Sequence, residues 1–120
     1  MNKYVDYVIR DIGVPAHLEG YEALALCMEY KLEDYKIPVC KLYQLVATKM
    51  NKTYGAVERN IRHLVNYMLD KGDIEKIENY FGSSLRADGK LTNKQFIYTL
   101  TLSAKRIKFT EEQNDANNGR

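Results

Sequence analysis

Three charged side chains in the middle of the chain have the types and the spacing that contact with DNA bases requires. Arg59 and Arg62 stand about one helical turn apart, and Glu58 directly precedes Arg59. An arginine can donate two parallel hydrogen bonds to O6 and N7 of a guanine, and a glutamate can accept one from the amino group of a cytosine. Glu58 also lies four residues before Arg62, the spacing at which a helix brings opposite charges together. These three residues form a candidate base-reading group.

The segment from Thr53 to Lys71 is predicted to be the helix that positions this group. Thr53 is a suitable N-cap and Gly72 a suitable end. A glycine inside a helix costs roughly 1 kcal/mol relative to alanine, so Gly55 indicates a place where the backbone must come close to a groove wall. At 100° per residue the segment has an apolar face, Val57, Ile61, Leu64, Val65 and Met68, and a polar face, Gly55, Arg59, Arg62, His63 and Asn66.

The residues before this helix complete a helix-turn-helix pattern. Such a motif needs a small residue where the two helices cross, a turn residue that tolerates the left-handed conformation, and an aliphatic residue between the helices. Ala47, Asn51 and Val57 supply these at the required spacing, since asparagine commonly replaces glycine in a left-handed turn. The pattern expects its next apolar residue at position 60, where this sequence has the polar Asn60. Ile61 is predicted to take over the role of that apolar residue.

Side chains around the predicted helix are suited to bind phosphate. Between Lys41 and Lys71 there are six basic and two acidic residues, a local net charge of +4 on a chain of +2, so the remainder is net negative. Basic side chains, hydroxyl groups and helix N-termini are the usual contacts to the DNA backbone. The expected backbone contacts are Lys41, Lys49, Lys52, Thr53, Tyr54, Gly55, His63 and Asn66.

Helical periodicity extends along most of the chain, and no alternating strand pattern occurs. The predicted fold is an all-α, six-helix single domain over residues 1–109, with the helix-turn-helix at about 40–71 and a disordered polar tail at 110–120. The second helix, with an apolar centre, is expected to be central and to turn its acidic flanks away from DNA. In the fifth, Ile74, Ile77, Tyr80 and Phe81 are expected to face inward. The predicted helices span about 4–12, 18–35, 39–50, 53–72, 73–82 and 92–108.

Composition excludes several classes of function. The longest apolar run has six residues, which is too short to cross a membrane, and the N-terminus has no signal peptide, so we expect a cytoplasmic protein that joins the nucleoid when bound to DNA. Cys27 and Cys40 show no metal-ligand spacing. No nucleophile motif, phosphate-binding loop or carboxylate pair in an apolar surround is present. We therefore expect no enzyme, no catalytic residue, no metal and no cofactor.

Four blocks resemble the C-terminal effector domain of the master sporulation response regulator of Firmicutes: 12–21 (IGVPAHLEGY), 57–63 (VERNIRH), 79–82 (NYFG) and 91–97 (LTNKQFI). The resemblance runs from about Tyr4 to Ile107. It implies a trilobed six-helix domain that binds short promoter sites, often in tandem as a head-to-tail homodimer, and regulates transcription. It also implies that Glu58, Arg59 and Arg62 read bases. Lys105, Arg106 and Lys108 would lie near DNA or a neighbouring protomer.

The sequence departs from this family in two ways. Family members usually carry a receiver domain ahead of the effector, whereas this chain begins just before it, so we expect a receiver-less copy or a cut piece. Gly55 and Ala56 stand where the family tends to have a small polar and a basic residue. These departures leave open a second hypothesis, an interaction module that partners a full-length regulator or the RNA polymerase sigma subunit without reading DNA.

Overall fold

Six helices, α1 to α6, make up the computed structural model of the protein, which describes residues 2–82, 85 and 88–118. No strand occurs within these residues, so the predicted all-α class is confirmed. The helices are α1 (Lys3–Asp11), α2 (Tyr21–Glu33), α3 (Val39–Met50), α4 (Tyr54–Lys71), α5 (Ile74–Phe81) and α6 (Asn93–Asn118).

The hydrophobic core forms around α2 and α6. Each of these two helices contacts four others: α2 lies against α1, α3, α4 and α6, and α6 lies against α1, α2, α4 and α5. Six of the thirteen residues of α2 are buried, Cys27 among them, as its apolar centre predicts. The aromatic rings of Phe81 and Phe96 stack with centroids 5.8 Å apart and join α5 to α6. The central position predicted for the second helix is therefore confirmed.

The second helix is shorter than the predicted span 18–35. Residues 15–18 form a turn in which the Leu18 amide donates to the Pro15 carbonyl. Gly20 adopts a φ of 97° ahead of the first helical residue, and Asp34 is extended after the last one. A left-handed residue cannot lie inside a right-handed helix, so the helix begins only at Tyr21.

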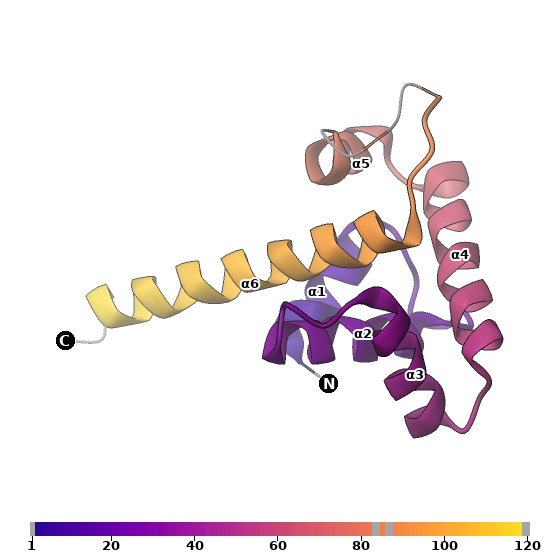
Figure 1. Ribbon diagram of the computed structural model, residues 1–120. Coiled ribbons are helices and arrows are strands. Elements are labelled where there is room, and N and C mark those ends of the chain that lie inside the picture. Colours follow the sequence, from indigo (N-terminus) through magenta and orange to yellow (C-terminus); the bar gives the residue numbers. More distant parts are fainter. Residues whose placement is uncertain (1, 83–84, 86–87, 119–120) are drawn as a thin grey trace.

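The third and fourth helices have the predicted bounds. Thr53 caps α4 through its Oγ1, which accepts from the Ala56 amide at 3.1 Å. Asn51, in the left-handed conformation with a φ of 55°, ends α3 and is the one non-glycine residue with positive φ in the described part of the chain. Figure 1 shows α4 along one edge of the molecule, with α3 beside its N-terminal end and α6 beginning next to it.

The last two helices differ from prediction in two places. Ile74 is 82% exposed instead of facing inward, because it occupies the first turn of α5, whereas Ile77 and Phe81 are buried and Tyr80 is half-buried against the core, as predicted. α6 opens with the predicted Thr92–Gln95 capping box. It then runs to Asn118, ten residues past the predicted end at Lys108, so residues 110–118 are helical rather than a disordered tail (Figure 1).

The extra length of α6 has a physical reason. Extending an existing helix avoids the cost of nucleation, and each added residue gains one backbone hydrogen bond. Glu111, Glu112, Gln113 and Ala116 are good helix formers. The Lys3 ammonium also lies 3.0 Å from the Glu111 carboxylate and connects this part of α6 to α1. Residues 119–120 of the predicted tail lie outside the described residues.

Candidate nucleic-acid interface

The turn between α3 and α4 fixes the angle between these two helices. The Lys52 amide donates to the Ala47 carbonyl at 2.9 Å, and the Asn51 amide donates to the Thr48 carbonyl at 3.3 Å. Ala47 and Val57 are both buried between the helices, as the helix-turn-helix pattern predicts. The rings of Tyr43 and Tyr54 meet edge to face at 5.4 Å and join α3 to the first turn of α4.

Asn60 stands where the helix-turn-helix pattern expects an apolar residue. The reason is that the backbone of the α1–α2 connection comes close to α4 at this position. A β-carbon on Gly20 would lie 3.0 Å from both Cβ and the carbonyl oxygen of Asn60. The loop therefore crosses α4 at this residue, where a longer aliphatic side chain would collide. Ile61 is fully buried instead, as predicted. The Asn60 amide nitrogen is buried without a hydrogen-bond partner among the described residues.

Arg59 lies at the centre of the outward face of α4. The five buried residues of this helix face the opposite direction at 100° per residue. Arg59 is exposed, and its guanidinium forms no ion pair or hydrogen bond with any described residue. The side chain lies back over Gly55, where an added β-carbon would be 3.3 Å from Nη1 of Arg59. The missing side chain at Gly55 thus provides the space in which this guanidinium rests.

Arg62 is placed differently from Arg59. It is half-buried, and its Nη2 donates to the backbone carbonyl of Leu91 at 2.8 Å. The Asn93 side chain donates in turn to the Glu58 carbonyl at 3.3 Å. These two bonds join the start of α6 to the flank of α4. The spacing of Glu58 and Arg62 predicts an ion pair, but Arg62 instead bonds a carbonyl 29 residues away.

The expected phosphate-contacting residues lie on α3, in the turn that follows it and along α4, and three of them are less available than the others. Lys52 approaches Glu19 at 3.9 Å, which partly compensates its charge. The Thr53 hydroxyl is already used as the helix cap. Gly55 is half-buried in the first turn. The remaining residues of this group are exposed: Lys41 and Lys49 on α3, and Tyr54, His63 and Asn66 on α4.

The C-terminal basic residues are not brought to this surface. Lys105, Arg106 and Lys108 are exposed on α6, which begins beside α4 and runs away from it (Figure 1). Lys105 is twelve residues from the start of α6, or about 18 Å at 1.5 Å per residue. The Lys105 ammonium lies over the Tyr35 ring at 5.6 Å.

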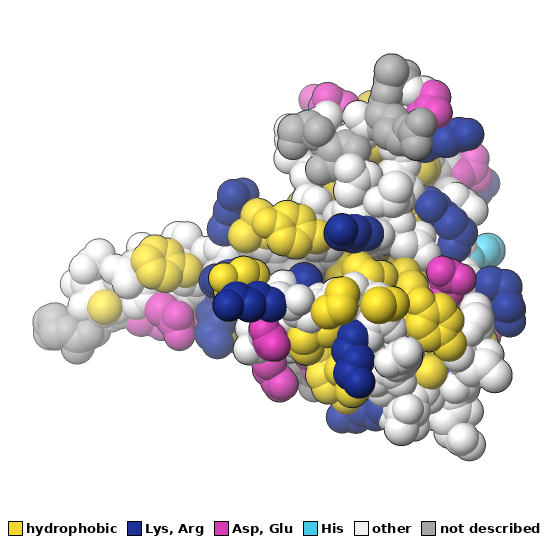
Figure 2. All heavy atoms as spheres, viewed as in Figure 1, with side chains coloured by type: hydrophobic (Ala, Val, Ile, Leu, Met, Phe, Trp, Pro, Cys, Tyr) yellow, Lys and Arg dark blue, Asp and Glu magenta, His cyan; other side chains and the backbone are white. Residues whose placement is uncertain are grey.

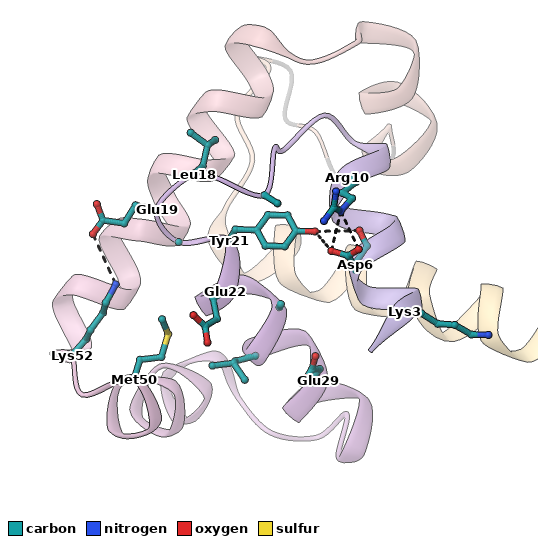
Figure 3. A pocket seen from close by; sticks show the side chains of 14 residues that line it. Lys3, Asp6, Arg10, Leu18, Glu19, Tyr21, Glu22, Glu29, Met50 and Lys52 are labelled. Carbon is teal, nitrogen blue, oxygen red and sulfur yellow. Dashed lines mark hydrogen bonds and ion pairs between the residues drawn. The ribbon is translucent and has the colours of Figure 1, made fainter. Parts of the chain in front are cut away.

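A groove of about 910 Å³ between α1, α2 and the end of α3 has a different electrostatic character. Its lining includes four carboxylates, Asp6, Glu19, Glu22 and Glu29, and three basic side chains, Lys3, Arg10 and Lys52 (Figure 3). Within it the Tyr21 hydroxyl donates to Asp6, which also accepts from the Arg10 guanidinium. The Tyr21 hydrogen bond, followed by those from Arg10, lowers the pKa of Asp6 despite its partial burial. The charges of this groove are therefore nearly balanced, and it is less favourable to a polyanion than a surface that carries basic residues alone.

A comparison with known proteins identifies the family. The family model described as sporulation initiation factor Spo0A C terminal matches residues 5–104, most of the chain. The chain belongs to this family. The Spo0A C-terminal family consists of DNA-binding effector domains of a response regulator that controls transcription in sporulation, and it is not a family of enzymes. No described helix is long and apolar enough to span a bilayer.

Two residues of this Spo0A C-terminal domain were missed by sequence reasoning. Leu91 and Asn93 are bonded to the flank of α4 that carries the candidate base-reading residues, yet they lie 29 and 35 positions away from their partners. The capping box at Thr92 locates the start of α6 but not the helix against which it lies. Both residues do lie in segment 91–97, one of the four that resemble the family, and this resemblance is the one feature of the sequence that points to them.

Proposed function

We propose that this domain binds duplex DNA sequence-specifically, with α4 in the major groove. The observation that supports it best is Arg59, an exposed guanidinium without an acidic partner in the described chain, centred on a helix whose opposite face is fully buried. In this proposal Arg59 donates to O6 and N7 of a guanine, and Glu58 accepts from a cytosine amino group. Arg62 reads a base with the N–H groups that its bond to Leu91 leaves free.

The proposed backbone contacts lie on α3, in the turn that follows it and along α4. Lys41 and Lys49 provide charge, and the first turn of α4 adds the N-terminal end of its helix dipole. His63 and Asn66 lie further along the outward face, while Lys52, Thr53, Tyr54 and Gly55 form the turn and the first residues of the helix. A domain with this function works in the cytoplasm, on the nucleoid.

Selection of bound duplexes from a random pool, followed by gel shifts, tests this proposal. We expect one enriched motif and an affinity that falls steeply with salt, as roughly four to eight phosphates are neutralised. Arg59→Ala should relax base preference at one position and cost about 1–3 kcal/mol, whereas Lys52→Ala should weaken all duplexes alike. Recovery of no motif from the wild-type domain would favour the interaction module, which binds a regulator or the sigma subunit instead.

The proposal extends to assembly on tandem sites. Lys105, Arg106 and Lys108 are exposed on α6, which runs away from the α4 of the same copy (Figure 1). We place them against a second copy or its DNA. Binding to duplexes with one and with two copies of the selected motif measures this directly. Replacement of the three residues by glutamine should abolish cooperativity on the tandem duplex and leave single-site affinity within a few-fold.

A further inference from the structure

A second basic surface lies next to the proposed reading helix. The α2–α3 connection and the N-terminal ends of α3 and α6 enclose a hollow of about 460 Å³. Three lysines, Lys31, Lys36 and Lys94, contribute to its lining, and none of the lining residues is acidic. This composition contrasts with the groove over α1 and α2, whose lining has both acidic and basic residues. A concave surface with charge of one sign attracts ligands of the opposite sign.

The lysines of this hollow lack acidic partners. Lys36 and Lys94 are exposed, and neither ammonium forms an ion pair with a described residue. Lys31 donates one N–H to the Ile37 carbonyl at 2.6 Å, which orients the side chain and leaves its charge uncompensated. Elsewhere four lysines have a carboxylate partner: Lys3, Lys52, Lys71 and Lys76. The positive charge of the hollow therefore remains available to an anionic ligand.

The hollow lies close to the proposed reading helix at two points. Lys94 directly follows Asn93, whose side chain is bonded to the backbone of Glu58 on α4. On the other side, Cys40 lines the hollow and neighbours Tyr54 in the first turn of α4. The pKa of Tyr54 is raised by desolvation and then by the nearby Glu58 and Cys40. Figure 2 shows Lys and Arg side chains over both α4 and the first part of α6 on this face.

We propose that this hollow binds the phosphodiester backbone of the duplex whose bases α4 contacts, with Lys36 and Lys94 as the phosphate ligands. The inference rests on the proposed function and extends the DNA-binding surface from α4 across α3 to α6. Compact ammonium groups on flexible stems suit phosphate oxygens, whose spacing along a strand does not depend on sequence. The hollow thus adds affinity without base preference.

A charge-removal experiment tests this extension. We compare the K36Q/K94Q double variant with K3Q/K71Q, which removes the same charge from two lysines that already have carboxylate partners. Each lost phosphate contact lowers the salt slope by about 0.9. K36Q/K94Q should lower that slope by nearly two and weaken binding roughly tenfold or more on every duplex, and K3Q/K71Q should leave both nearly unchanged. Circular dichroism verifies that both variants are folded.

A footprint at Cys40 provides an independent readout. Of the two cysteines, Cys27 is fully buried, and burial raises the pKa of its thiol to about 12. Iodoacetamide should therefore alkylate Cys40, which is exposed in the hollow. The selected duplex should slow this alkylation severalfold. A duplex trimmed to the base pairs that α4 covers should protect Cys40 less.

The outcomes separate this inference from the proposed function. Two results together would overturn the phosphate role of the hollow. They are a salt dependence of DNA affinity that is unchanged in K36Q/K94Q, and a rate of Cys40 alkylation that is equal in free and DNA-bound protein. Sequence-specific binding that is sensitive to Arg59→Ala would still stand in that case. If wild-type protein binds no duplex, both the proposed function and the inference that rests on it are wrong.

Discussion

The guanidinium of Arg62 donates to the backbone carbonyl of Leu91 at 2.8 Å, so a residue of the proposed reading helix also holds the entry to α6. Leu91 is buried, and its carbonyl would otherwise need another donor. The neighbouring bond from Asn93 to the Glu58 carbonyl strengthens the same junction. Arg62 therefore has a structural role that Arg59 lacks, and this difference can be measured.

We predict that replacing the two arginines affects stability to different extents. Arg62→Ala should lower the free energy of unfolding by about 1–3 kcal/mol, because a charged donor is lost and a buried carbonyl is left unpaired. Arg59→Ala should stay within about 0.5 kcal/mol of wild type, as surface substitutions usually do. Urea denaturation followed by circular dichroism measures both. Equal unfolding free energies for the two variants would contradict the assigned role of Arg62.

Gly55→Ala should separate stability from DNA binding. Alanine has the better helix propensity, so the free energy of unfolding should rise by roughly 0.5–1 kcal/mol. The new methyl group would lie 3.3 Å from Nη1 of Arg59 and displace this guanidinium from its resting place. Affinity for the selected duplex should therefore fall although the protein is more stable. Ala56→Gly, the reverse change at the next residue, is the control and should lower stability.

The sequence predicts the helix-turn-helix well because its determinants are local. Thr53, Asn51 and Gly72 act within one turn of the helix ends that they mark, and the bounds of α3 and α4 agree with prediction. The partner of Arg62 could not be found in this way, since Leu91 lies in an irregular connection far along the chain. The spacing alone favoured an ion pair between Arg62 and Glu58 on the same helix. In the structure Arg62 instead bonds the carbonyl of Leu91, which lies far along the chain.

The errors elsewhere have a similar origin. Periodicity assigns Ile74 to the inward face of α5, yet burial depends on where the neighbouring helices end. Composition assigns residues 110–118 to a polar tail, whereas an existing helix can continue through them with the help of Glu111. The base-reading and phosphate-binding roles of the exposed residues stay predictions, because no ligand contact tests them.

Gly20→Ala should destabilise the domain strongly. Its φ of 97° disfavours any β-carbon, and the added carbon would lie 3.0 Å from two atoms of Asn60, one of them backbone. Left-handed strain and overpacking together should lower the free energy of unfolding by about 2–4 kcal/mol. Gly89→Ala is the matched control, because Gly89 has a φ of 78° and nothing within 4 Å of an added β-carbon. It should lose only about 1–2 kcal/mol from backbone strain.

Thermal unfolding of both glycine variants measures this difference. A loss at Gly20 no greater than the loss at Gly89 would mean that the α1–α2 connection does not approach α4 as closely as the structure has it. DNA binding by the Gly20 variant at low temperature adds a second readout, since a displaced connection should also shift the orientation of α4.

The hydrogen bond between Tyr21 and Asp6 should make stability depend on pH. The folded pKa of Asp6 is lowered, first by Tyr21 and then by Arg10, from an ordinary value of 3.8. The contribution of the carboxylate to stability is therefore fully present well above the ordinary pKa of 3.8, and it is lost as pH falls through the lower folded pKa. Burial, followed by Asp6, raises the pKa of Tyr21 to about 12, so its hydroxyl still donates at neutral pH.

Tyr21→Phe removes the principal cause of the Asp6 shift. At pH 7 the variant should be about 1–2 kcal/mol less stable than wild type, as expected for a hydrogen bond to a charged group. Near pH 2 the difference should shrink, because protonated Asp6 no longer gains from the bond. Tyr7→Phe makes the same chemical change at an exposed tyrosine and should be neutral at both pH values. A Tyr21→Phe loss that is equal at pH 7 and pH 2 would show that packing of the ring, not its bond to Asp6, stabilises this corner of the fold.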